Sequence, residues 1–442
     1  MLSPSKIKSI FSSIISQMSE NVQHYVLSPG KDFTRNRKCS FSDLILAILS
    51  FENHSLPKEI ADYFASVKRP APSPSAFVQQ RAKLNDEAFP ALFHAFNSSI
   101  PFTKTLKGIH LIACDGTDIN LPTDHSDSLY RVRYKKDARI RGYWQMHVTA
   151  CYDLLENRYL DLVIQPRPSS NETAALCTMV QRCPLDGKLL YIADRGFPSL
   201  NVMAHIFDVG QFFLFRVTSP ESCSSFLKHA DLPRSGEFDR KLTLRITRSY
   251  RKKYRKHPER YHFLHRKRTF DFIDPGDRDT VFAFDLRVIC VTLGNGTKEY
   301  LVTNLPADSF SLEDLKELYR LRWGIETSFR SLKYALSLSC LHSIKRSFTI
   351  QEIYAKMIMY NWASLLAAFA EKGLPSKRNG SSKDYHIPFC DAVRITRRLI
   401  SERITNSSIR ILLQSRKIPI RTGRVYPRNV RSQSAVPLNY RG

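Results

Sequence analysis

Apolar residues in the first hundred positions recur at the three- and four-residue spacing of amphipathic helices. Residues 40–49 and 55–64 begin with a serine, and residues 73–84 begin with Ser73 followed by Pro74. Serine is a favoured N-cap, and proline is favoured at the first helical position. Three short helices joined by sharp turns are compatible with a helix-turn-helix reader of DNA, and equally with any small helical bundle.

From about residue 106 the pattern changes to short, strongly apolar runs, which are typical of strands. Two of these runs form a predicted hairpin around the polar turn "LLEN". The predicted elements are strand 108–117, hairpin 143–166, helix 171–183, strand 188–197, helix 198–210 and strand 211–217. Strands interleaved with helices in this order predict a mixed α/β sheet.

A second group of strands interrupts this series. Residues 241–248 and 281–294 alternate apolar and polar side chains, as half-buried antiparallel strands do, and a further strand is predicted at 298–306. Between the first two strands lies the segment 248–268, in which ten of twenty-one residues are Lys or Arg. Such a run is ordinarily a solvated loop, but its tyrosines and histidines favour a hairpin that contacts phosphates. Residues 311–370 return to helical spacing.

Charge narrows the possible partners. The chain has 442 residues, enough for two or three domains, and its 67 Lys and Arg against 41 Asp and Glu give a net charge of +26. Self-repulsion of such an excess destabilises a folded protein, so a polyanionic partner is the usual explanation, and nucleic acid is favoured over a membrane. The longest apolar runs, such as residues 44–49, are far shorter than the roughly 20 residues that span a bilayer.

The nine cysteines are scattered along the chain, and none forms a CxxC pair. Several lie in apolar runs, such as Cys114 and Cys290, and we interpret them as small core residues of a reduced protein. The pattern supports neither a zinc site nor a disulfide framework. The first residues lack the apolar region and cleavage site of a secretory signal, so we expect a cytoplasmic protein.

Two apolar runs carry an acid near their ends: Asp115 in "ACDGT" and Asp194 in "IADRGF". The carboxyl end of a buried strand is where ligands bind in α/β sheets, although an aspartate there is more often a turn residue or a helix cap. A third acid, Glu326, lies in the predicted helix 317–333. Three carboxylates at one edge would form a hard-oxygen site of the kind that Mg²⁺ prefers.

Glu326 shares one face of its predicted helix with Tyr319, Arg322 and Lys333. At about 100° per residue, steps of three, four and seven keep these side chains within a sector of roughly 60°. A carboxylate between cations and a phenol is either a surface ion network or a metal ligand beside a track for phosphates. Two Mg²⁺ ions about 3.5–4 Å apart can catalyse an in-line displacement at phosphorus.

These residues together resemble a known family. The array Tyr319-x2-Arg322-x3-Glu326-x6-Lys333, with "DGT" at Asp115 and "DRGF" at Asp194, resembles the signature of the DDE transposases of bacterial insertion sequences, in the group called insertion sequence family four. The resemblance covers about residues 108–370. It implies a ribonuclease H-like mixed sheet flanked by helices, interrupted by a β-strand-rich insertion, with a helical N-terminal domain.

The resemblance also implies a division of the chain. The expected parts are an N-terminal domain for DNA-end recognition at 1–105, a first part of the catalytic core at 106–218, a β-rich basic insertion at 219–308, the core helix with the third acid at 309–372, and a basic C-terminal region and tail at 373–442.

The implied activity is cut-and-paste DNA transposition. Asp115, Asp194 and Glu326 would hold two Mg²⁺ or Mn²⁺ ions, which support phosphodiester hydrolysis at the element ends and transfer of the freed 3′-hydroxyl into target DNA. Tyr319 and the array's two cations would contact the DNA backbone near the cleaved end. The implied partners are double-stranded DNA, as terminal inverted repeats and target, and a second copy of the chain on that DNA, in the nucleoid of the bacterial cytoplasm and without a membrane.

Further residues are assigned less specific roles. Trp323 would stack on a displaced base or pack at the helix flank, and Arg195 would position phosphate or pair locally. Asp118 is a nearby rival of Asp115, and Glu172 is interpreted as an acid at a helix N-terminus. The basic residues expected to contact DNA in the insertion are Arg251, Lys252, Lys253, Arg255 and Lys256.

Two other functions are compatible with these patterns. One is a nuclease with the same metal site but without strand transfer, and the other is a DNA-binding regulator in which the acids serve structure alone. The presence of all three acids and of the full four-residue array argues against the regulator, because binding alone would not require them.

Overall fold

The structure, a computed structural model, describes residues 2–35, 37–133, 142–294, 296–375, 383–401 and 408–420. The tail expected at the end of the C-terminal region, from residue 421 on, lies outside the described residues. In the part of the chain that is described, no helix is both long enough and apolar enough to cross a bilayer.

The N-terminal part is helical, as expected. Its elements are α1 (Pro4–Glu20), the 3-10 turn η1 (Val22–Tyr25), α2 (Phe41–Ser50), α3 (Leu56–Ser66), α4 (Pro74–Arg81) and α5 (Ala88–Ser99). The side chain of Ser40 accepts a hydrogen bond from the Asp43 amide at 3.1 Å, and that of Ser73 accepts one from the Ala76 amide at 3.2 Å. These two serine caps therefore begin α2 and α4 where the sequence predicts.

One large sheet forms the centre of the molecule. Its strand order is β2-β3-β1-β5-β6-β10-β9-β7-β8, with β4 also paired to β3. The strands of its first part are β1 (Ile109–Leu121), β2 (Arg131–Val132), β3 (Tyr143–Asp153), β4 (Arg158–Pro166), β5 (Lys188–Ala193) and β6 (Phe212–Val217). β1, β3 and β4 form an antiparallel meander, while β5 and β6 run parallel to β1 on its other side. This is the ribonuclease H-like arrangement, and the predicted mixed α/β fold is confirmed.

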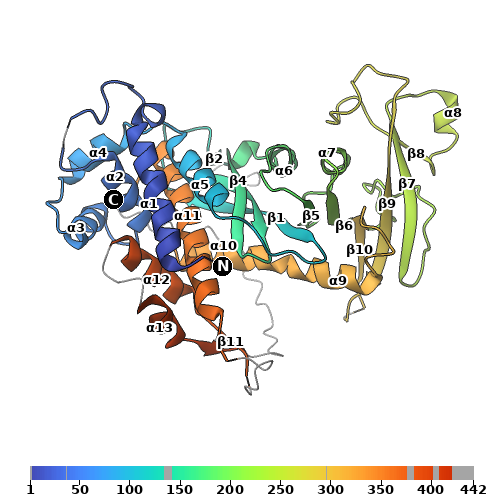
Figure 1. Cartoon of the computed structure of the whole chain (residues 1–442). Coiled ribbons are helices and arrows are strands. Elements are labelled where there is room, and N and C mark those ends of the chain that lie inside the picture. The colour runs from blue at the N-terminus through green and yellow to red at the C-terminus, as the bar shows by residue number, and fades with distance from the viewer. Residues whose placement is uncertain are drawn as a thin grey trace.

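Helices cover both faces of this sheet (Figure 1). The flanking elements are η2 (Arg167–Ser169), α6 (Glu172–Gln181) and α7 (Leu200–Asp208) on one face, and α9 (Leu312–Leu321), α10 (Trp323–Tyr334) and α11 (Arg346–Glu371) on the other. Successive side chains of a strand point to opposite faces. Ile112 and Cys114 of β1 accordingly pack with α6 and α7, whereas Ala113 and Ile119 pack in the cluster that contains α10 and α11.

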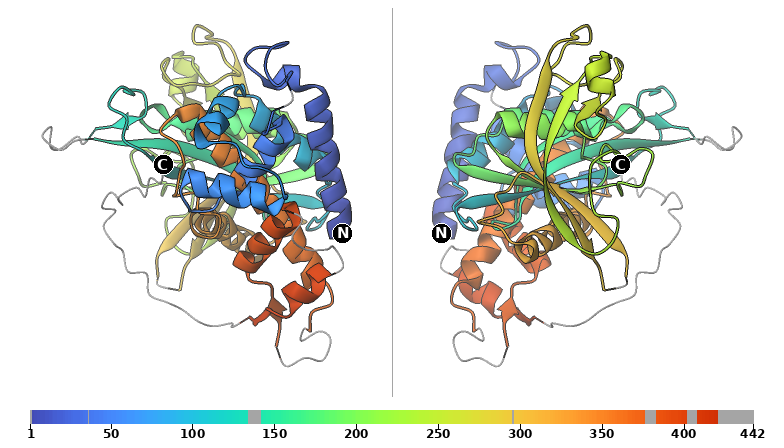
Figure 2. Two further views of the ribbon diagram at one scale, coloured as in Figure 1. Left: turned by 90° about the vertical axis from the view of Figure 1, so that its left-hand side faces the viewer. Right: turned by 90° about the vertical axis from the view of Figure 1, so that its right-hand side faces the viewer.

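The strands between residues 219 and 308 extend the same sheet. β7 (Phe238–Thr247) pairs antiparallel with β9 (Val281–Thr292), as the alternating pattern predicts, and β10 (Lys298–Thr303) pairs antiparallel with both β9 and β6. β10 thus joins these strands to the first part of the sheet. Figures 1 and 2 show that β7 and β9 form the end of the molecule opposite the N-terminal helices.

The basic segment 248–268 differs from the expected hairpin. It contains the one-turn helix α8 (Lys252–Arg255) and the short strand β8 (Tyr261–Phe263). β8 runs parallel to β7, so the chain crosses over before it pairs. Parallel neighbours cannot be joined by a tight turn, and a run of cations gives no signal of strand direction.

The C-terminal helices pack with the N-terminal ones. Their elements are β11 (Tyr385–His386), α12 (Phe389–Ile400), α13 (Ile409–Gln414) and β12 (Ile418–Pro419). One hydrophobic cluster contains buried side chains from α1, α2, α5, β3, α10, α11, α12 and α13. The N-terminal helices therefore share their core with the central sheet and with α11.

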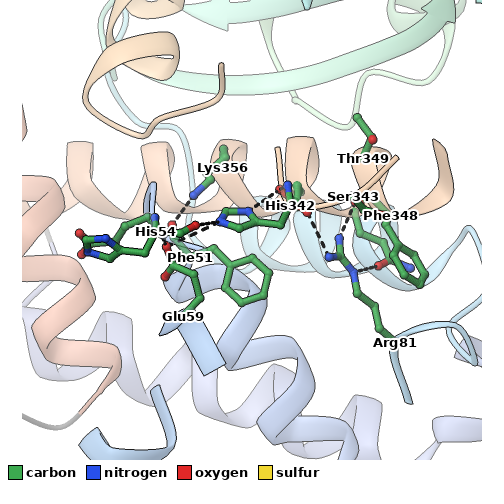
Figure 3. A network of polar contacts seen from close by, with 12 residues as sticks. Phe51, His54, Glu59, Arg81, His342, Ser343, Phe348, Thr349 and Lys356 are labelled. Atoms are coloured by element: carbon green, nitrogen blue, oxygen red, sulfur yellow. Dashed lines mark hydrogen bonds and ion pairs between the residues drawn. The ribbon is translucent and has the colours of Figure 1, made fainter. Parts of the chain in front are cut away.

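A buried ionic network also joins the N-terminal helices to α11 (Figure 3). Arg81 of α4 and Glu352 of α11 are each 1% exposed, and their side chains pair at 3.0 Å. The other carboxylate oxygen of Glu352 lies 3.0 Å from Nδ1 of His342, and Nε2 of His342 lies 3.6 Å from Glu59 of α3. Lys356, also buried, lies beside these groups. Opposite charges alternate from Arg81 through Glu352 and His342 to Glu59, and Lys356 donates a hydrogen bond to the backbone carbonyl of Phe51, so each of these buried groups has a partner.

All nine cysteines are free thiols. The buried ones are Cys39, Cys114, Cys151, Cys177 and Cys290. Burial raises the pKa of Cys39 and of Cys177 to about 12. Such thiols remain protonated near neutral pH, in agreement with their interpretation as core residues.

Candidate active site

Two of the predicted acids lie on neighbouring strands where the two strands stop pairing. β1 and β5 run parallel, and their ladder ends with Cys114 opposite Ala193. The residue that follows each member of this pair is an acid: Asp115 follows Cys114 on β1, and Asp194 follows Ala193 directly after β5. Because both acids follow the same last pair, their carboxylates lie at the edge of the parallel strands where ligands bind in α/β folds.

Asp115 does not end its strand, contrary to the expected strand 108–117. β1 continues to Leu121 through its pairing with β3, in which Asp115 lies opposite Ala150. Beyond Asp115, β5 no longer pairs with β1. The continuous run of apolar residues therefore changes there to a pattern in which buried and partly exposed side chains alternate. The end of that run therefore marks the end of the parallel ladder and not the end of the strand.

The four residues of the array lie on two successive helices. Tyr319 belongs to α9, Glu326 and Lys333 belong to α10, and Arg322 is the single residue between these helices. Arg322 has helical backbone angles, φ −49° and ψ −35°, so α10 directly continues from α9 along the sheet (Figure 1). The predicted helix is thus present with an interruption at Arg322.

Arg322 connects two of the acids. Its Nη2 donates a hydrogen bond to Oε1 of Glu326 at 2.7 Å, and its Nη1 lies 3.8 Å from Oδ2 of Asp115. The Arg322 side chain is only 3% exposed, and its guanidinium lies 5.0 Å from the centre of the Trp323 ring. Burial is the largest single effect on the pKa of Arg322 and lowers it, but the hydrogen bond to Glu326 and the nearby negative charges together outweigh burial, so the net shift is upward. Arg322 is therefore a buried counter-ion of the acids in this structure.

Asp194 is contacted by Tyr319 and by Arg216, a residue that the sequence did not indicate. The Tyr319 hydroxyl donates to Oδ1 of Asp194 at 3.2 Å, and Nη1 of Arg216 lies 3.7 Å from the same oxygen. Arg216 of β6 also pairs with Glu299 of β10, at 3.1 Å. Arg216 and Glu299 were both missed: Arg216 is the one charged side chain of "FFLFRV", a contrast that could have identified it, whereas Glu299 follows Lys298 in "KEYLVT" and carries no such signal.

The electrostatics and the donor chemistry of this site suit a divalent cation. Burial raises the pKa of Asp115 to about 6, and the charges of Glu326 and Glu172 act in the same direction. Carboxylate oxygens are the ligands that Mg²⁺ prefers. Among the residues that the structure describes, no three His, Cys, Asp or Glu side chains already form a metal-binding group. In this structure Arg322 is the shared counter-ion of Asp115 and Glu326.

The other residues near the acids that are predicted to contact DNA are exposed or partly buried. Trp323 is 46% exposed, and Arg195, directly after Asp194, is also exposed. The amide of Arg195 donates to Oδ1 of Asp194 at 2.8 Å. Lys333 is partly buried, and burial lowers its pKa although Asp118 opposes that effect. Trp323 and Arg195 thus lie beside the acids and are reachable from solvent.

The basic residues of the insertion lie away from the acids. Arg251, Lys252, Lys253, Arg255 and Lys256 are exposed on and around α8, which lies at the far end of the insertion from α10 (Figure 1). Arg251 also pairs with Asp279. The role of these five residues as DNA contacts stays a prediction.

The two rival acids have partners of their own. Asp118 lies 2.7 Å from Nδ1 of His147 and 3.0 Å from Arg167. Glu172 is the first residue of α6, as expected for an acid at a helix N-terminus, and lies 2.9 Å from Nε2 of His147. Asp118 and Glu172 therefore share His147 as a partner, whereas Asp115 lies beside Arg322.

Comparisons with known proteins agree with these features. The profile of the family described as "Transposase DDE domain" matches residues 107–362, a range that includes all three acids and the four-residue array. Two Escherichia coli relatives, the InsL transposase of insertion sequence element IS186A from strain K12 and the transposase of insertion sequence element IS421, are each 38% identical over 58 residues. That match spans 13% of this chain and 16% of each relative.

A solved structure also aligns with most of the chain. It is the synaptic complex of the piggyBac transposase with hairpin DNA, at 11% sequence identity and a TM-score of 0.48. The alignment covers 93% of this chain and 81% of that chain.

Proposed function

This chain belongs to the family described as transposase DDE domain, whose profile covers more than half of it, and from that premise we propose that it is a DNA transposase. The proposed reaction is metal-dependent hydrolysis of a phosphodiester at the ends of an insertion sequence, followed by transfer of the freed 3′-hydroxyl into target DNA. Asp115, Asp194 and Glu326 are the proposed metal ligands.

One observation supports this assignment most directly. Arg322 and Tyr319, which belong to the same array as Glu326, contact the two aspartates from the other segments: Arg322 lies 3.8 Å from Asp115, and Tyr319 donates to Asp194 at 3.2 Å. Three acids far apart along the chain thus share one set of neighbours. Burying the Arg322 guanidinium beside these partly exposed acids is costly to fold, and a role in binding cations and phosphates explains why the arrangement is present.

Members of this family work with divalent metal ions, and we propose two Mg²⁺ or Mn²⁺ ions here. Bound at the three acids, such ions would supply Lewis-acid activation of the attacking oxygen and charge neutralisation at the leaving oxygen. The carboxylates of Asp115, Asp194 and Glu326 would hold them. We infer that Arg322 then turns from the carboxylates toward the phosphate of the cut strand, where its planar guanidinium can form paired hydrogen bonds.

The remaining groups of the array would position the DNA. The Tyr319 hydroxyl now donates to Asp194, and Lys333 lies two turns after Glu326 on α10; both would contact the DNA backbone near the cut. Trp323 and Arg195, exposed beside the acids, would contact the strand that is displaced. These contacts would fix the geometry of attack.

The proposed partner is double-stranded DNA, first as the element's terminal inverted repeats and then as the target. The net charge of +26 and the exposed cations of α8, in the insertion, support it. We propose that two copies act together, because two element ends must be cut and joined. The proposed location is the bacterial nucleoid, where this substrate lies.

An in vitro assay tests the proposal. Duplexes that carry the terminal repeats flanking the coding region are incubated with the full chain, a supercoiled target plasmid and Mg²⁺. Joined products are expected. Cleavage without joining would instead indicate a nuclease, and salt-sensitive binding without cleavage would indicate a DNA-binding regulator.

A further inference from the structure

The carboxylate of Glu172 lies against both segments that carry the catalytic aspartates. Gly116 follows Asp115, and a methyl group added at Gly116 would overlap Oε1 of Glu172 and the ring of His147. Gly196 lies two residues after Asp194, and a Cβ there would lie 3.1 Å from Oε2 of Glu172. One oxygen of Glu172 therefore faces each segment, and both segments have a glycine at the point of approach.

Glu172 approaches from the face of the sheet opposite to Glu326. Side chains alternate along β1, so Asp115 points to the face of α10, whereas Gly116 and Asp118 face α6. Glu172, at the start of α6, thus supports the backbone of β1 from behind Asp115. Its contact with Gly196 supports the turn behind Asp194 in the same way.

His147 holds this carboxylate in place. His147 is 4% exposed, with Nε2 2.9 Å from Oε1 of Glu172 and Nδ1 2.7 Å from Oδ1 of Asp118. Asp118 and His147 are direct cross-strand partners on β1 and β3, and Arg167 holds Asp118 from outside at 3.0 Å. Burial alone would lower the pKa of His147, but its two carboxylate partners outweigh burial and raise that pKa to about 9. His147 is consequently a cation between two anions near neutral pH.

Helix capping does not explain the arrangement. The N-cap of α6 is Asn171, whose side chain accepts a hydrogen bond from the Ala174 amide at 3.1 Å. The helix therefore has its cap without Glu172. A first-turn acid also gains from the helix dipole in solvent, where it would not need a buried histidine or two glycines beside it.

We propose that Glu172, held by the ring of His147, is a positioning residue that fixes the separation of Asp115 and Asp194 and so sets the affinity of the site for divalent cations. The inference rests on the proposed function, because it concerns the acids named there as metal ligands. Glu172 acts through the backbone at Gly116 and Gly196. Groups behind the direct ligands commonly change metal affinity by about 10–100-fold when they are removed.

The first test measures local structure without any metal. Hydrogen exchange of the full chain is compared between the wild type and Glu172→Ala, in peptides that cover residues 112–118 and 194–199. Faster exchange in both peptides is expected for Glu172→Ala and for His147→Ala, with a smaller effect for Glu172→Gln, which keeps the volume but loses the charge. Unchanged exchange in these peptides would overturn the proposal, whatever the metal measurements give.

The chain offers a matched control at the other end of the same helix. Arg182, the C-cap of α6, pairs with the buried Asp161 at 2.6 Å. Asp161→Asn breaks an ion pair that anchors α6 without touching either glycine. In this variant, hydrogen exchange should become faster near residues 161 and 182 and should stay unchanged in the peptide 194–199. If Asp161→Asn accelerates that peptide as much as Glu172→Ala does, Glu172 only anchors the helix and the positioning role is refuted.

The second test titrates Mn²⁺ alone into the full chain, with free Mn²⁺ followed by electron paramagnetic resonance. Glu172→Ala should weaken Mn²⁺ binding about tenfold or more at a temperature well below the melting temperature of either protein, while Asp161→Asn should bind as the wild type does. Wild-type affinity in Glu172→Ala would overturn the link to metal binding. If Glu326→Gln binds Mn²⁺ as tightly as the wild type, the proposed metal site itself is wrong. The hydrogen-exchange experiment contains no metal, so it tests the positioning role of Glu172 separately from the metal site.

Discussion

At the scale of single residues, the acids of this site are distinguished by their neighbours and not by their own type. Asp115 and Asp118 are three positions apart on one strand, yet Asp115 faces Arg322 and Glu326, whereas Asp118 pairs with His147. Strand alternation sends them to opposite faces of the sheet. The same residue type therefore serves the proposed catalytic site at one position and an ion pair at the other.

Removing one proposed ligand should separate catalysis from binding. Glu326→Gln should abolish DNA cleavage while end binding stays nearly unchanged, because the substitution removes a metal ligand and leaves the phosphate contacts. Gel-shift and cleavage assays on the same duplex measure both. Glu317→Gln on α9 is the control, since Glu317 is exposed and pairs with Arg320 on the surface. A Glu326→Gln protein that cuts at a comparable rate would refute the ligand assignment.

Lys333 should act as a single phosphate contact. Lys333→Ala should weaken binding to the element end and reduce the slope of log K against log salt concentration by about one, as expected when one phosphate loses its cation. Fluorescence anisotropy over a range of salt concentrations measures this slope. An unchanged slope would assign Lys333 to the protein's own electrostatics, where its pKa is already lowered by burial.

The pairing of His147 should appear in the pH dependence of stability. Its pKa is about 9 in the folded protein, against roughly 6.5 in an unfolded chain. A raised pKa means that the folded state binds the proton more tightly, so the stabilisation is complete below about pH 6.5 and disappears as the pH rises through about 9. The groups facing His147 are Asp118 and Glu172, with Arg167 behind Asp118.

Urea unfolding of the wild type and of His147→Gln tests this titration. The difference in unfolding free energy should be largest at pH 6 and should shrink toward pH 9.5. A difference that grows with pH over this range would contradict the ion-pair assignment.

At the scale of elements, the site depends on how helices and strands begin and end. β1 extends beyond the last residue of its neighbour β5, and Asp115 and Asp194 directly follow the last pair of residues that joins the two strands. α9 ends and α10 begins around Arg322, which places Tyr319 against Asp194 and Glu326 against Arg322. Asp194, Tyr319, Arg322 and Glu326 therefore come from the ends of elements, whereas Asp115 lies within β1 at the point where β5 stops pairing with it.

The start of α9 should matter for stability. Ser311 and Asp314 form a capping box, with hydrogen bonds of 3.2 Å to the Asp314 amide and 2.9 Å to the Ser311 amide. Ser311→Ala should lower the free energy of unfolding by about 0.5–2 kcal/mol, measured by urea titration. Ser55→Ala is the matched control: Ser55 is the N-cap of α3, but its side chain makes no capping hydrogen bond, so a smaller effect is expected. Equal losses in both variants would argue against the capping box.

At the scale of the whole molecule, the N-terminal helices and the central sheet form one body. They share a hydrophobic cluster with α11 and the C-terminal helices, and the ionic network of Arg81, Glu352, His342, Glu59 and Lys356 joins them (Figure 3). Such a shared interior predicts that these parts unfold together, and that a DNA end bound by the N-terminal helices would be held rigidly relative to the acids.

Breaking the network on one side should reveal this coupling. Arg81→Met leaves Glu352 buried without its strongest partner and should cost about 3–5 kcal/mol of unfolding free energy. The double variant Arg81→Met with Glu352→Leu removes both charges and should recover part of that loss. Lys58→Ala, which breaks the exposed pair with Asp62, is the control and should change little. Two separate unfolding transitions in Arg81→Met would show that the parts are independent.

The sequence predicted much of the fold and the composition of the site, for physical reasons that differ by residue. Helix caps such as Ser40 and strand alternation in β7 and β9 are local patterns, so they could be read directly. The array around Glu326 could be read because its spacing follows the helical period. Arg216, Glu299 and His147 were missed, because their roles arise from neighbours on other strands that local patterns do not specify.

The amino-acid sequence by itself determined most of the helices and strands, which acids directly follow apolar strand runs, and that the chain carries a large excess of positive charge. Local propensity, periodicity and composition are properties of neighbouring residues, so they need no fold to be read. Only the tertiary structure decided that β8 runs parallel to β7, that Arg322 is buried between Asp115 and Glu326, and that Glu172 lies behind both aspartates. Those relations join residues tens to hundreds of positions apart, and they exist only once strand order and helix packing have brought the segments together.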